Sequence, residues 1–389
     1  MAGSQLDERQ GNPISLSSNG KRMAVGGRLH DSGGTQTLVN NGIVRVFEEV
    51  NGNWNSLGQS ILGTNSDDEM GWAVAMSGSG SRVAVGATGY QSHTGLVQVY
   101  ELVANGWVKV GDDIVGDDEL DSFGSWISMS EDGNEVAIGA SQRGGTTERG
   151  YVRVFRLINN SWQGRRTIIR GEANGDRSGQ SLALTRDGTV LAIGGLENDD
   201  AGVNSGHVRV FGFQNGWSAM GPDLNGEATG DRFGRSVALS DDGGTVAVGG
   251  NRNNANGADS GHVQVFQYDS NVNTWQQMGD DIDGKAASDE FGWRVELSSD
   301  GKTLAVGAWG GDFIGNGIKG EDAGYVSIFR FIGSSWVQLG ENIFGLSAGD
   351  EAGRDISISA DGSRIAVGAP RALSSRGSIR IFEIDTNRL

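Results

Sequence analysis

The chain has 389 residues, and its 31 Lys and Arg against 49 Asp and Glu give a net charge of −18, which disfavours nucleic acid and anionic lipid surfaces as partners. It contains no cysteine, which excludes disulfides, thiolate metal sites and a cysteine nucleophile. No apolar run reaches the roughly 18 residues of a membrane span and no charged-then-apolar leader opens the chain, so we do not expect membrane insertion.

A repeated pattern organises the whole chain. Seven copies of Gly-x-Val-x-Val-Phe, some with Ile or Tyr exchanged, follow one another at spacings of 53 to 63 residues. They begin at Gly42, Gly95, Gly150, Gly206, Gly261, Gly324 and Gly377. A period of this length is typical of propeller blades, which cannot bury their faces without neighbours. We therefore expect residues 1–389 to form a single domain.

Each unit predicts four short antiparallel strands. In residues 232–278, apolar residues alternate over 234–239, and the turn sequence Asp241-Asp242-Gly243-Gly244 separates them from a second strand at 246–248. Third and fourth strands are expected at 262–266 and 275–278. Four strands repeated seven times without a helix predict an all-β, seven-bladed propeller. A parallel β-helix is disfavoured because its repeats are far shorter.

The closing of the ring is the irregular feature. Strand four carries a Trp in six units and not in the seventh, at Trp54, Trp107, Trp162, Trp217, Trp275 and Trp336. We expect a last blade of three strands, or one that is completed from outside this chain. Gly3 lies eight residues before Gly11, as Gly226 lies eight before Gly234, which suggests that the chain starts inside a repeat.

Phe123-Gly124, Phe233-Gly234 and Phe291-Gly292 open three units, and Val367-Gly368-Ala369-Pro370 ends the second strand of the last. These residues resemble the FG-GAP repeats of the integrin alpha-chain propeller. The resemblance implies a recognition or adhesion module at the cell surface. Integrin-type repeats often carry a calcium loop between strands one and two, but here that segment is a tight turn such as Ser298-Ser299-Asp300-Gly301, so calcium is not carried over to that position.

A carboxylate precedes the first strand of every unit. It lies three residues before the strand's opening Gly, at Glu8, Asp68, Asp121, Asp176, Asp231, Asp289 and Asp350. A ring of seven carboxylates around one face would suit a cation or a cationic ligand. The alternative is that each accepts backbone N–H groups in its own loop, and we favour it because a local hydrogen bond serves every blade equally.

The densest acidic cluster is the better metal candidate, because it is unique to its unit. It consists of Asp117, Asp118, Glu119 and Asp121. Carboxylates this close repel one another unless they are neutralised or solvated, and calcium is the cofactor that would neutralise them. An exposed acidic loop without an ion is the alternative.

The loop between Trp309 and Ala323 is the longest connection between strands two and three, and such loops are where function usually lies on a rigid scaffold. Aromatic side chains beside Asp and Asn can stack on a sugar ring and bond its hydroxyls. The expected ligand-binding residues are Trp309, Asp312, Phe313, Asn316 and Lys319. Alternatively, the aromatic residues fold the insertion onto the next blade.

The sequence contains no recognisable catalytic motif. His207 and His262 hold equivalent positions immediately after a repeat Gly and are interpreted as structural, and no Ser, His and Asp set has the spacing of a triad. The function that we expect is an extracellular or cell-surface recognition module that binds a protein or glycan through its loop-rich face. The alternatives are a polysaccharide lyase or hydrolase with an acidic or metal-assisted site at the axial opening, and a structural module of a larger surface protein.

Overall fold

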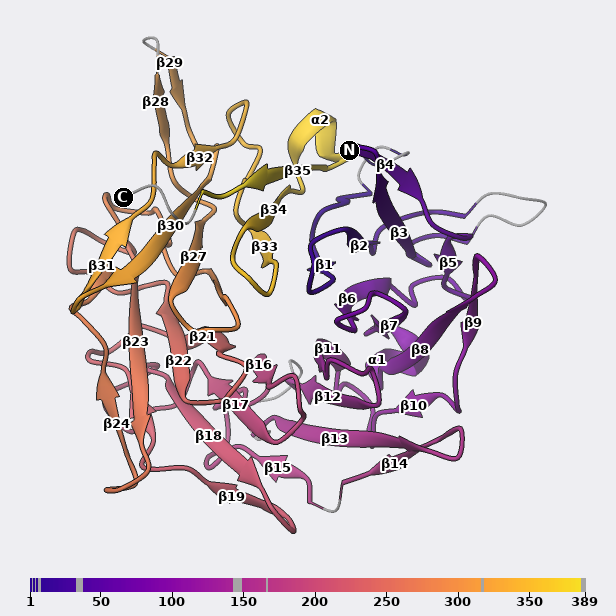
Figure 1. Cartoon of the computed structure of the whole chain (residues 1–389), viewed down its shortest axis with the longest axis horizontal. Coiled ribbons are helices and arrows are strands. Elements are labelled where there is room, and N and C mark those ends of the chain that lie inside the picture. Colours follow the sequence, from indigo (N-terminus) through magenta and orange to yellow (C-terminus); the bar gives the residue numbers. More distant parts are fainter. Residues whose placement is uncertain are drawn as a thin grey trace.

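A computed structural model describes residues 1–389 apart from residues 2, 4, 6, 7, 33–37, 143–148, 166, 316–317 and 386–389. In this part of the chain, seven antiparallel sheets follow one another around a central axis, and the first sheet lies beside the last (Figure 1). We number these sheets as blades 1 to 7. The structure confirms the seven-bladed β-propeller that the repeat predicts.

The blades share one strand order, running outward from the axis. The innermost strands are β1 (Ile14–Leu16), β6 (Met70–Met76), β11 (Phe123–Met129), β16 (Ser181–Leu184), β21 (Phe233–Leu239), β26 (Arg294–Leu297) and β33 (Asp355–Ile358). The second strands are β2 (Arg22–Gly27), β7 (Arg82–Ala87), β12 (Glu135–Ala140), β17 (Val190–Gly195), β22 (Thr245–Gly250), β27 (Thr303–Ala308) and β34 (Arg364–Ala369).

The third strands carry the Gly-x-Val-x-Val-Phe pattern. They are β3 (Ile43–Val50), β8 (Leu96–Val103), β13 (Tyr151–Ile158), β18 (His207–Phe213), β23 (His262–Asp269), β30 (Tyr325–Ile332) and β35 (Ser378–Glu383). The fourth strands are β4 (Asn53–Ser56), β9 (Gly106–Lys109), β14 (Ser161–Gly164), β19 (Trp217–Ala219), β24 (Thr274–Gln277) and β31 (Ser335–Gln338).

A two-residue strand follows the fourth strand in blades 1 to 6 and pairs with the beginning of strand three. These short strands are β5 (Ile61–Leu62), β10 (Ile114–Val115), β15 (Ile169–Arg170), β20 (Leu224–Asn225), β25 (Ile282–Asp283) and β32 (Ile343–Phe344). These short strands were not predicted from the sequence as elements separate from strand four. The outer edge of each of these blades is therefore built from two segments.

The blades pack through their second strands. All six residues of β22 are buried, because this strand lies between two neighbours in its sheet and is covered on both faces by adjacent blades. Its Val-Ala-Val-Gly-Gly sequence is nearly continuous in apolar and small residues, as expected for a strand that is buried on both faces. The second strands of blades 3 to 6 are buried at all six residues, and β2, β7 and β34 differ only at their first residue, which is Arg22, Arg82 or Arg364.

A glycine in every second strand sets the distance between blades. A methyl group at any of these glycines would lie 2.0–2.3 Å from the carbonyl oxygen of a glycine at the start of the next blade's first strand. The seven second-strand glycines are Gly26, Gly86, Gly139, Gly194, Gly249, Gly307 and Gly368. No side chain fits this spacing, which explains why the glycine recurs with the repeat.

The N-terminus completes blade 7. Among the described residues this blade has three strands, and Met1 exchanges backbone hydrogen bonds with Ile379 of β35 at 2.8 and 2.9 Å. The N–H of Gly3 donates to the carbonyl of Gly377 at 3.3 Å, as the N–H of Gly63 does to Gly42 in blade 1. Met1 and Gly3 thus pair with β35 where the other blades have their two-residue strand, and the last blade has the three strands that were one of the two expectations.

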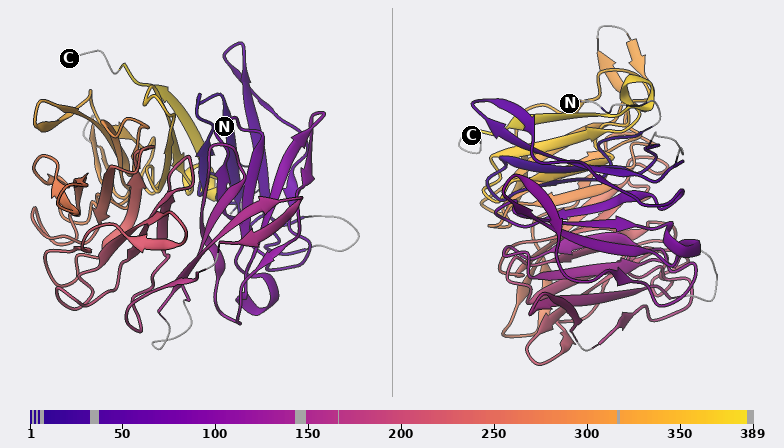
Figure 2. Two further views of the ribbon diagram at one scale, coloured as in Figure 1. Left: turned by 60° about the horizontal axis from the view of Figure 1, so that its bottom comes forward. Right: turned by 90° about the vertical axis from the view of Figure 1, so that its right-hand side faces the viewer.

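The two faces of the ring differ. The connections between second and third strands include α1 (Tyr90–His93), α2 (Ala372–Ser375) and the hairpin of β28 (Phe313–Gly315) with β29 (Ile318–Gly320). Seen from the edge, these elements lie toward one side of the ring, which we call the loop face, and the hairpin also extends beyond the outer edge of the ring (Figure 2, right). No helix in the described ranges is long and apolar enough to cross a membrane.

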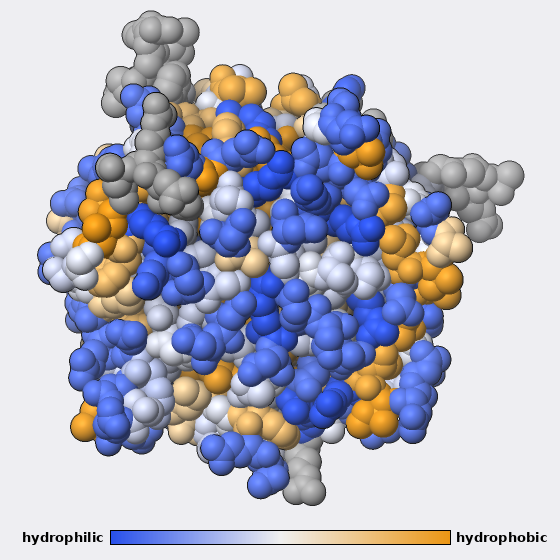
Figure 3. Space-filling view, viewed as in Figure 1, coloured by the Kyte–Doolittle hydropathy of each residue, from blue (hydrophilic) through white to orange (hydrophobic). Residues whose placement is uncertain are grey.

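The Ser-x-Asp-Gly turns between first and second strands form the opposite face, which we call the turn face. In blade 5, Asp242 accepts hydrogen bonds from the Ser240 hydroxyl at 2.6 Å and the Gly244 N–H at 2.9 Å, so the turn is stabilised locally. The centre of this face is covered mostly by hydrophilic residues (Figure 3).

We predict that Gly249→Ala strongly destabilises the protein. The added methyl group would lie 2.0 Å from the Gly292 carbonyl oxygen, and relieving this clash requires two blades to separate. We expect a loss of at least about 2 kcal/mol in the free energy of unfolding. The control is Gly216→Ala, because nothing lies within 4 Å of the new methyl group there. Urea unfolding of both variants checks this, and equal stabilities would contradict the packing argument.

Candidate functional site

One side chain from each blade surrounds the axis on the loop face. It belongs to the residue that follows the opening Gly of strand one: Asn12, Trp72, Ser125, Gln180, Arg235, Trp293 and Arg354. In β6, β11 and β21 this position lies in a β-bulge, where the register with strand two shifts. Bulges of this kind redirect side chains and are frequent beside functional sites. The repeat holds the backbone constant while these seven side chains vary.

These residues line a cavity of about 260 Å³, which we call the axial mouth. Four arginines and three tryptophans contribute to its wall: Arg28, Arg235, Arg294, Arg354, Trp72, Trp126 and Trp293. Asp355 is the one carboxylate among the described lining residues. A cationic cavity on a chain with a net charge of −18 requires an explanation beyond general surface composition.

The arginines and tryptophans of the mouth are stacked on one another. The guanidinium carbon of Arg235 lies 3.7 Å from the ring centre of Trp293, and that of Arg28 lies 4.3 Å from Trp72. Arg294 of blade 6 reaches Trp126 of blade 3 at 4.4 Å. Stacking fixes each guanidinium plane while its N–H groups remain at the edge of that plane.

Carboxylates beside the mouth hold some of these arginines in place. Arg28 lies 3.6 Å from Glu69, and Arg354 forms an ion pair with Glu351. Farther out on the loop face, burial and then the nearby charge of Arg252 lower the pKa of Arg232. Closely spaced guanidinium groups, several of them paired with carboxylates, therefore gather around the mouth of a chain whose net charge is negative.

The floor of the mouth is an ion-pair network on the inner strands. Arg294 pairs with Asp355 at 2.8 Å and with Glu296 at 2.9 Å. A quarter of the Glu296 side chain is exposed, but only to the narrow axial channel. Desolvation there raises the pKa of Glu296 to about 7, against the opposing effect of Arg294.

The turn face closes the other end of the axis. Backbone hydrogen bonds of 2.8–3.0 Å join neighbouring Ser-x-Asp-Gly turns, for example from the Ser18 N–H to the Gly78 carbonyl. Between blades 4 and 5, the turns are joined by an ion pair of 2.8 Å from Arg186 to Asp241. Arg186 also contacts Glu131 of the neighbouring blade 3 and Ser18 of blade 1. A ligand of the axial mouth would therefore enter from the loop face.

The structure places Trp309 next to the axial mouth. Its ring centre lies 5.5 Å from that of Trp293, the Arg354 guanidinium lies 5.0 Å away, and its Nε1–H donates to Glu290 at 3.2 Å. Asp312 accepts a hydrogen bond from the Asp322 N–H at 3.2 Å across the base of the loop.

Two of the other residues predicted in this loop, Phe313 and Lys319, lie farther along the hairpin. Phe313 belongs to β28, Lys319 belongs to β29, and Asn316 lies outside the described residues. The hairpin projects away from the ring in Figure 1. Ligand binding by Asp312, Phe313, Asn316 and Lys319 stays a prediction.

The seven carboxylates that precede the first strands stabilise their own loops by accepting backbone hydrogen bonds. Each of the seven side chains is buried, and each accepts at least one backbone N–H three or four residues earlier in its own loop. Asp68, for example, accepts from Asn65 at 2.8 Å and from Thr64 at 3.1 Å. This is the local role that we favoured from the sequence.

The four acidic residues predicted as a metal site in blade 3 have different partners and do not converge on one point. Asp121 accepts hydrogen bonds from the N–H groups of Asp117 and Asp118 and from the Tyr151 hydroxyl, and Asp117 pairs with Arg153 at 2.7 Å. Asp118 and Glu119 are exposed. In the described part of the chain, the four side chains do not form one of the groups whose ligand atoms lie within 4.8 Å of one another. A calcium site here stays a prediction.

The arginine and tryptophan side chains of the axial mouth were not predicted from the sequence. A signal for them exists, because the residue after the opening Gly of strand one is the variable position inside an otherwise constant motif. Arg28 and Arg294 carry no such signal. They are placed at the axis only by the closing of the ring.

Comparisons with known proteins agree with the fold. Residues 225–266 match the family model of the FG-GAP repeat, and with the seven-bladed ring this match fits an FG-GAP-like propeller. A search of curated protein sequences found no match.

Two solved structures are similar over most of their length. Hydrazine synthase of Kuenenia stuttgartiensis has a TM-score of 0.62 at 12% identity, covering 98% of this chain and 97% of that one. A putative 6-phosphogluconolactonase of Bacteroides uniformis has a TM-score of 0.55 at 14% identity, covering 88% and 92%. At these identities the likeness concerns the fold alone.

We predict that Asp68→Ala destabilises the protein by about 1–2 kcal/mol, because two loop N–H groups lose their buried acceptor. The control is Asp112→Ala at an exposed position, which we expect to change stability by no more than about 0.5 kcal/mol. Chemical unfolding with calcium and with chelator measures both effects. A loss that appears only with calcium would favour a cation role for Asp68.

We predict that Glu296→Gln stabilises the protein more at pH 8 than at pH 5. The folded carboxyl has a pKa of about 7 against 4.5 when unfolded, so between these values only the folded state holds the proton and wild-type stability falls as the pH rises. The difference should reach about 1–3 kcal/mol at pH 8. Urea unfolding at both pH values measures it, with exposed Glu341→Gln as the control. A pH-independent difference would contradict this prediction.

Proposed function

We propose that this FG-GAP-like propeller is an extracellular or cell-surface recognition module that binds a carboxylate-bearing glycan at the axial mouth. The FG-GAP propeller fold suggests a binding or structural module. The observation that carries the proposal is the set of four arginines and three tryptophans around one cavity of a strongly acidic protein.

The chemistry of the wall suits an acidic sugar. A guanidinium group offers a planar pair of N–H donors that matches a carboxylate, and the apolar face of a sugar ring packs on indole. The stacking of Arg235 on Trp293 and of Arg28 on Trp72 holds the guanidinium planes before a ligand arrives. This ordering lowers the entropy that binding would otherwise cost.

The size of the mouth favours a single sugar unit. Its 260 Å³ lies just below the range of about 300–1,000 Å³ that is usual for small-molecule sites. The joined turns of the turn face lie across the far end of the axis, so a polymer would present one residue or one end to the mouth. Trp309 lies beside Trp293 at the rim, where a second sugar unit would pass.

The test is binding of oligouronates compared with the same oligosaccharides after methyl esterification, which removes the charge and keeps the ring. We expect Arg235→Ala and Arg354→Ala each to weaken oligouronate binding by roughly 10- to 100-fold, because each removes a charge-assisted contact. Binding should also weaken with added salt. Isothermal titration calorimetry measures both effects.

The matched control is Arg156→Ala, which removes an exposed arginine of β13 that lies 3.7 Å from Glu135 and outside the residues that line the mouth. It should bind like the wild type. Equal affinity for the acid and its ester, or equal losses in all three variants, would refute the proposed site. A chain that binds neither form would favour the structural-module alternative.

An acidic-polysaccharide enzyme is the second candidate, and the raised pKa of Glu296 favours it. A carboxyl that titrates near 7 beside an arginine can exchange a proton at neutral pH, as a catalytic acid or base must. Chromatography of oligouronates after incubation would reveal cleavage. If the chain is an enzyme that uses Glu296, then Glu296→Gln abolishes cleavage and retains binding.

A further inference from the structure

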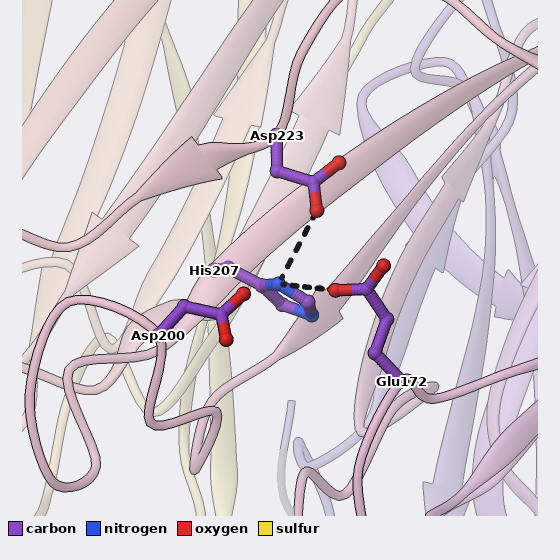
Figure 4. Close-up of side chains that lie close together, drawn as sticks. All are labelled: Glu172, Asp200, His207 and Asp223. Atoms are coloured by element: carbon purple, nitrogen blue, oxygen red, sulfur yellow. Dashed lines mark ion pairs between the residues drawn. The ribbon is translucent and has the colours of Figure 1, made fainter.

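Two adjacent blades each hold a buried histidine against carboxylates at the surface. His207 opens β18, and its Nδ1 lies 3.8 Å from an oxygen of Glu172 and 3.8 Å from one of Asp223 (Figure 4). His262 opens β23, and its Nδ1 lies 3.9 Å from Asp281. In the part of the chain that the structure describes, two groups bring all their ligand atoms within 4.8 Å: Glu172, Asp200, His207 and Asp223; and Glu227, His262 and Asp281.

The repeat builds the two groups from equivalent positions. The glutamates occupy the second position of Gly-Glu-Ala-x-Gly-Asp at 171–176 and 226–231. Asp223 and Asp281 each lie two residues after a Gly and directly before the short strands β20 and β25. The same arrangement therefore arises twice by one structural rule, which a chance collection of exposed acids would not produce.

Neither histidine has a hydrogen-bond partner. Both side chains are at most 1% exposed, and neither ring nitrogen of either residue makes a hydrogen bond. Burial, and then the charge of Arg209, lower the pKa of His207, so its imidazole is held neutral. An unpartnered buried imidazole nitrogen is costly unless something outside the protein binds it.

Each imidazole packs against a glycine of the neighbouring strand. A methyl group at Gly195 would lie 2.7 Å from Nε2 of His207, and one at Gly250 would lie 2.6 Å from Nε2 of His262. These glycines are the cross-strand partners of the two histidines. With Nε2 held against the glycine, the Nδ1 side of each ring faces the carboxylates.

Blades 3 and 6 carry a tyrosine at the position of these histidines. Its hydroxyl has a hydrogen-bond partner, which the imidazoles lack. The Tyr151 hydroxyl donates to Asp121 at 2.6 Å, and the Tyr325 hydroxyl donates to Asp289 at 2.8 Å. An imidazole is shorter than a phenol and does not reach the equivalent carboxylate. Where His replaces Tyr, the ring nitrogen is left facing the carboxylates of the rim.

The carboxylates of blade 4 crowd one another. Desolvation, and then the charge of Glu172, raise the pKa of Asp223 to about 6. Arg209 lies 3.7 Å from Glu172 and offsets part of this repulsion. In blade 5, the Gln264 amide donates to Glu227 at 2.9 Å and to Asp281 at 3.0 Å, which holds these two carboxylates together.

We propose that blades 4 and 5 each bind one divalent transition-metal ion, with zinc as the reference ion, between the buried histidine and the carboxylates of the rim. Two ligand atoms 3.8 Å apart can share one ion at the usual zinc distances of about 2.0–2.2 Å. The imidazole nitrogen selects against calcium and magnesium, which prefer oxygen ligands. The carboxylates are partly exposed, so the ion has a path from solvent.

The test is the zinc stoichiometry of the full chain by equilibrium dialysis with elemental analysis, in the presence of a tenfold excess of calcium. We expect two zinc ions per chain, one in His207→Tyr, one in His262→Tyr and none in the double variant. Tyrosine is a matched replacement because two blades already carry it at this position. Circular dichroism and a thermal melt verify that the variants fold.

Zinc retained by the double variant, a wild-type chain that binds none, or displacement of zinc by calcium would each overturn the proposal. If a Tyr variant fails to fold, Asp223→Asn and Asp281→Asn serve instead. Each keeps its histidine and should weaken the site in its own blade by at least tenfold while the other site is unchanged. Equal affinities at both sites in either Asn variant would refute the assignment.

Discussion

The contact between a glycine of one blade and a glycine of the next is the constraint on which the ring depends. At all seven boundaries, a methyl group on the second-strand glycine would lie within 2.3 Å of a backbone oxygen of the next blade. This close approach places the inner strands side by side, so that Asp355 of blade 7 accepts the N–H of Ile14 of blade 1 at 2.6 Å. The closing of the ring and the width of the axis follow from it.

The backbone and the glycine contacts are the same in every blade, whereas a few side-chain positions vary. The axial mouth and the two proposed metal sites occupy such variable positions. The residue after the opening Gly of strand one projects to the axis and ranges from Asn12 to Trp72 to Arg235. The first residue of strand three lies near the rim and changes between Tyr151 and His207. Exchanges at these positions alter chemistry without disturbing the packing between blades, because neither side chain lies between the two glycines in contact.

The fold could be predicted because its causes are local and repeated. Period-two alternation, Ser-x-Asp-Gly turns and the repeat Gly each act within one unit, and the loop-capping role of residues such as Asp68 follows from hydrogen bonds over four positions. The axial mouth could not be predicted in the same way. Arg294 and Trp126 lie three blades apart along the chain and meet only because the ring closes. The histidines were interpreted as structural since their unbonded nitrogens are visible only in three dimensions.

The charges of the proposed metal sites affect how the axial mouth attracts an acidic ligand. A chain with a net charge of −18 repels an acidic polymer at long range, and the arginines of the axial mouth reverse this field only over a distance comparable to the Debye length of about 10 Å. The His207 and His262 groups belong to the loops and strand starts of the same face, where exposed carboxylates add to the repulsion. Two divalent ions would remove that local negative charge. Metal binding at the rim would then strengthen the attraction of an acidic ligand to the axis, although no residue of either metal group touches the mouth.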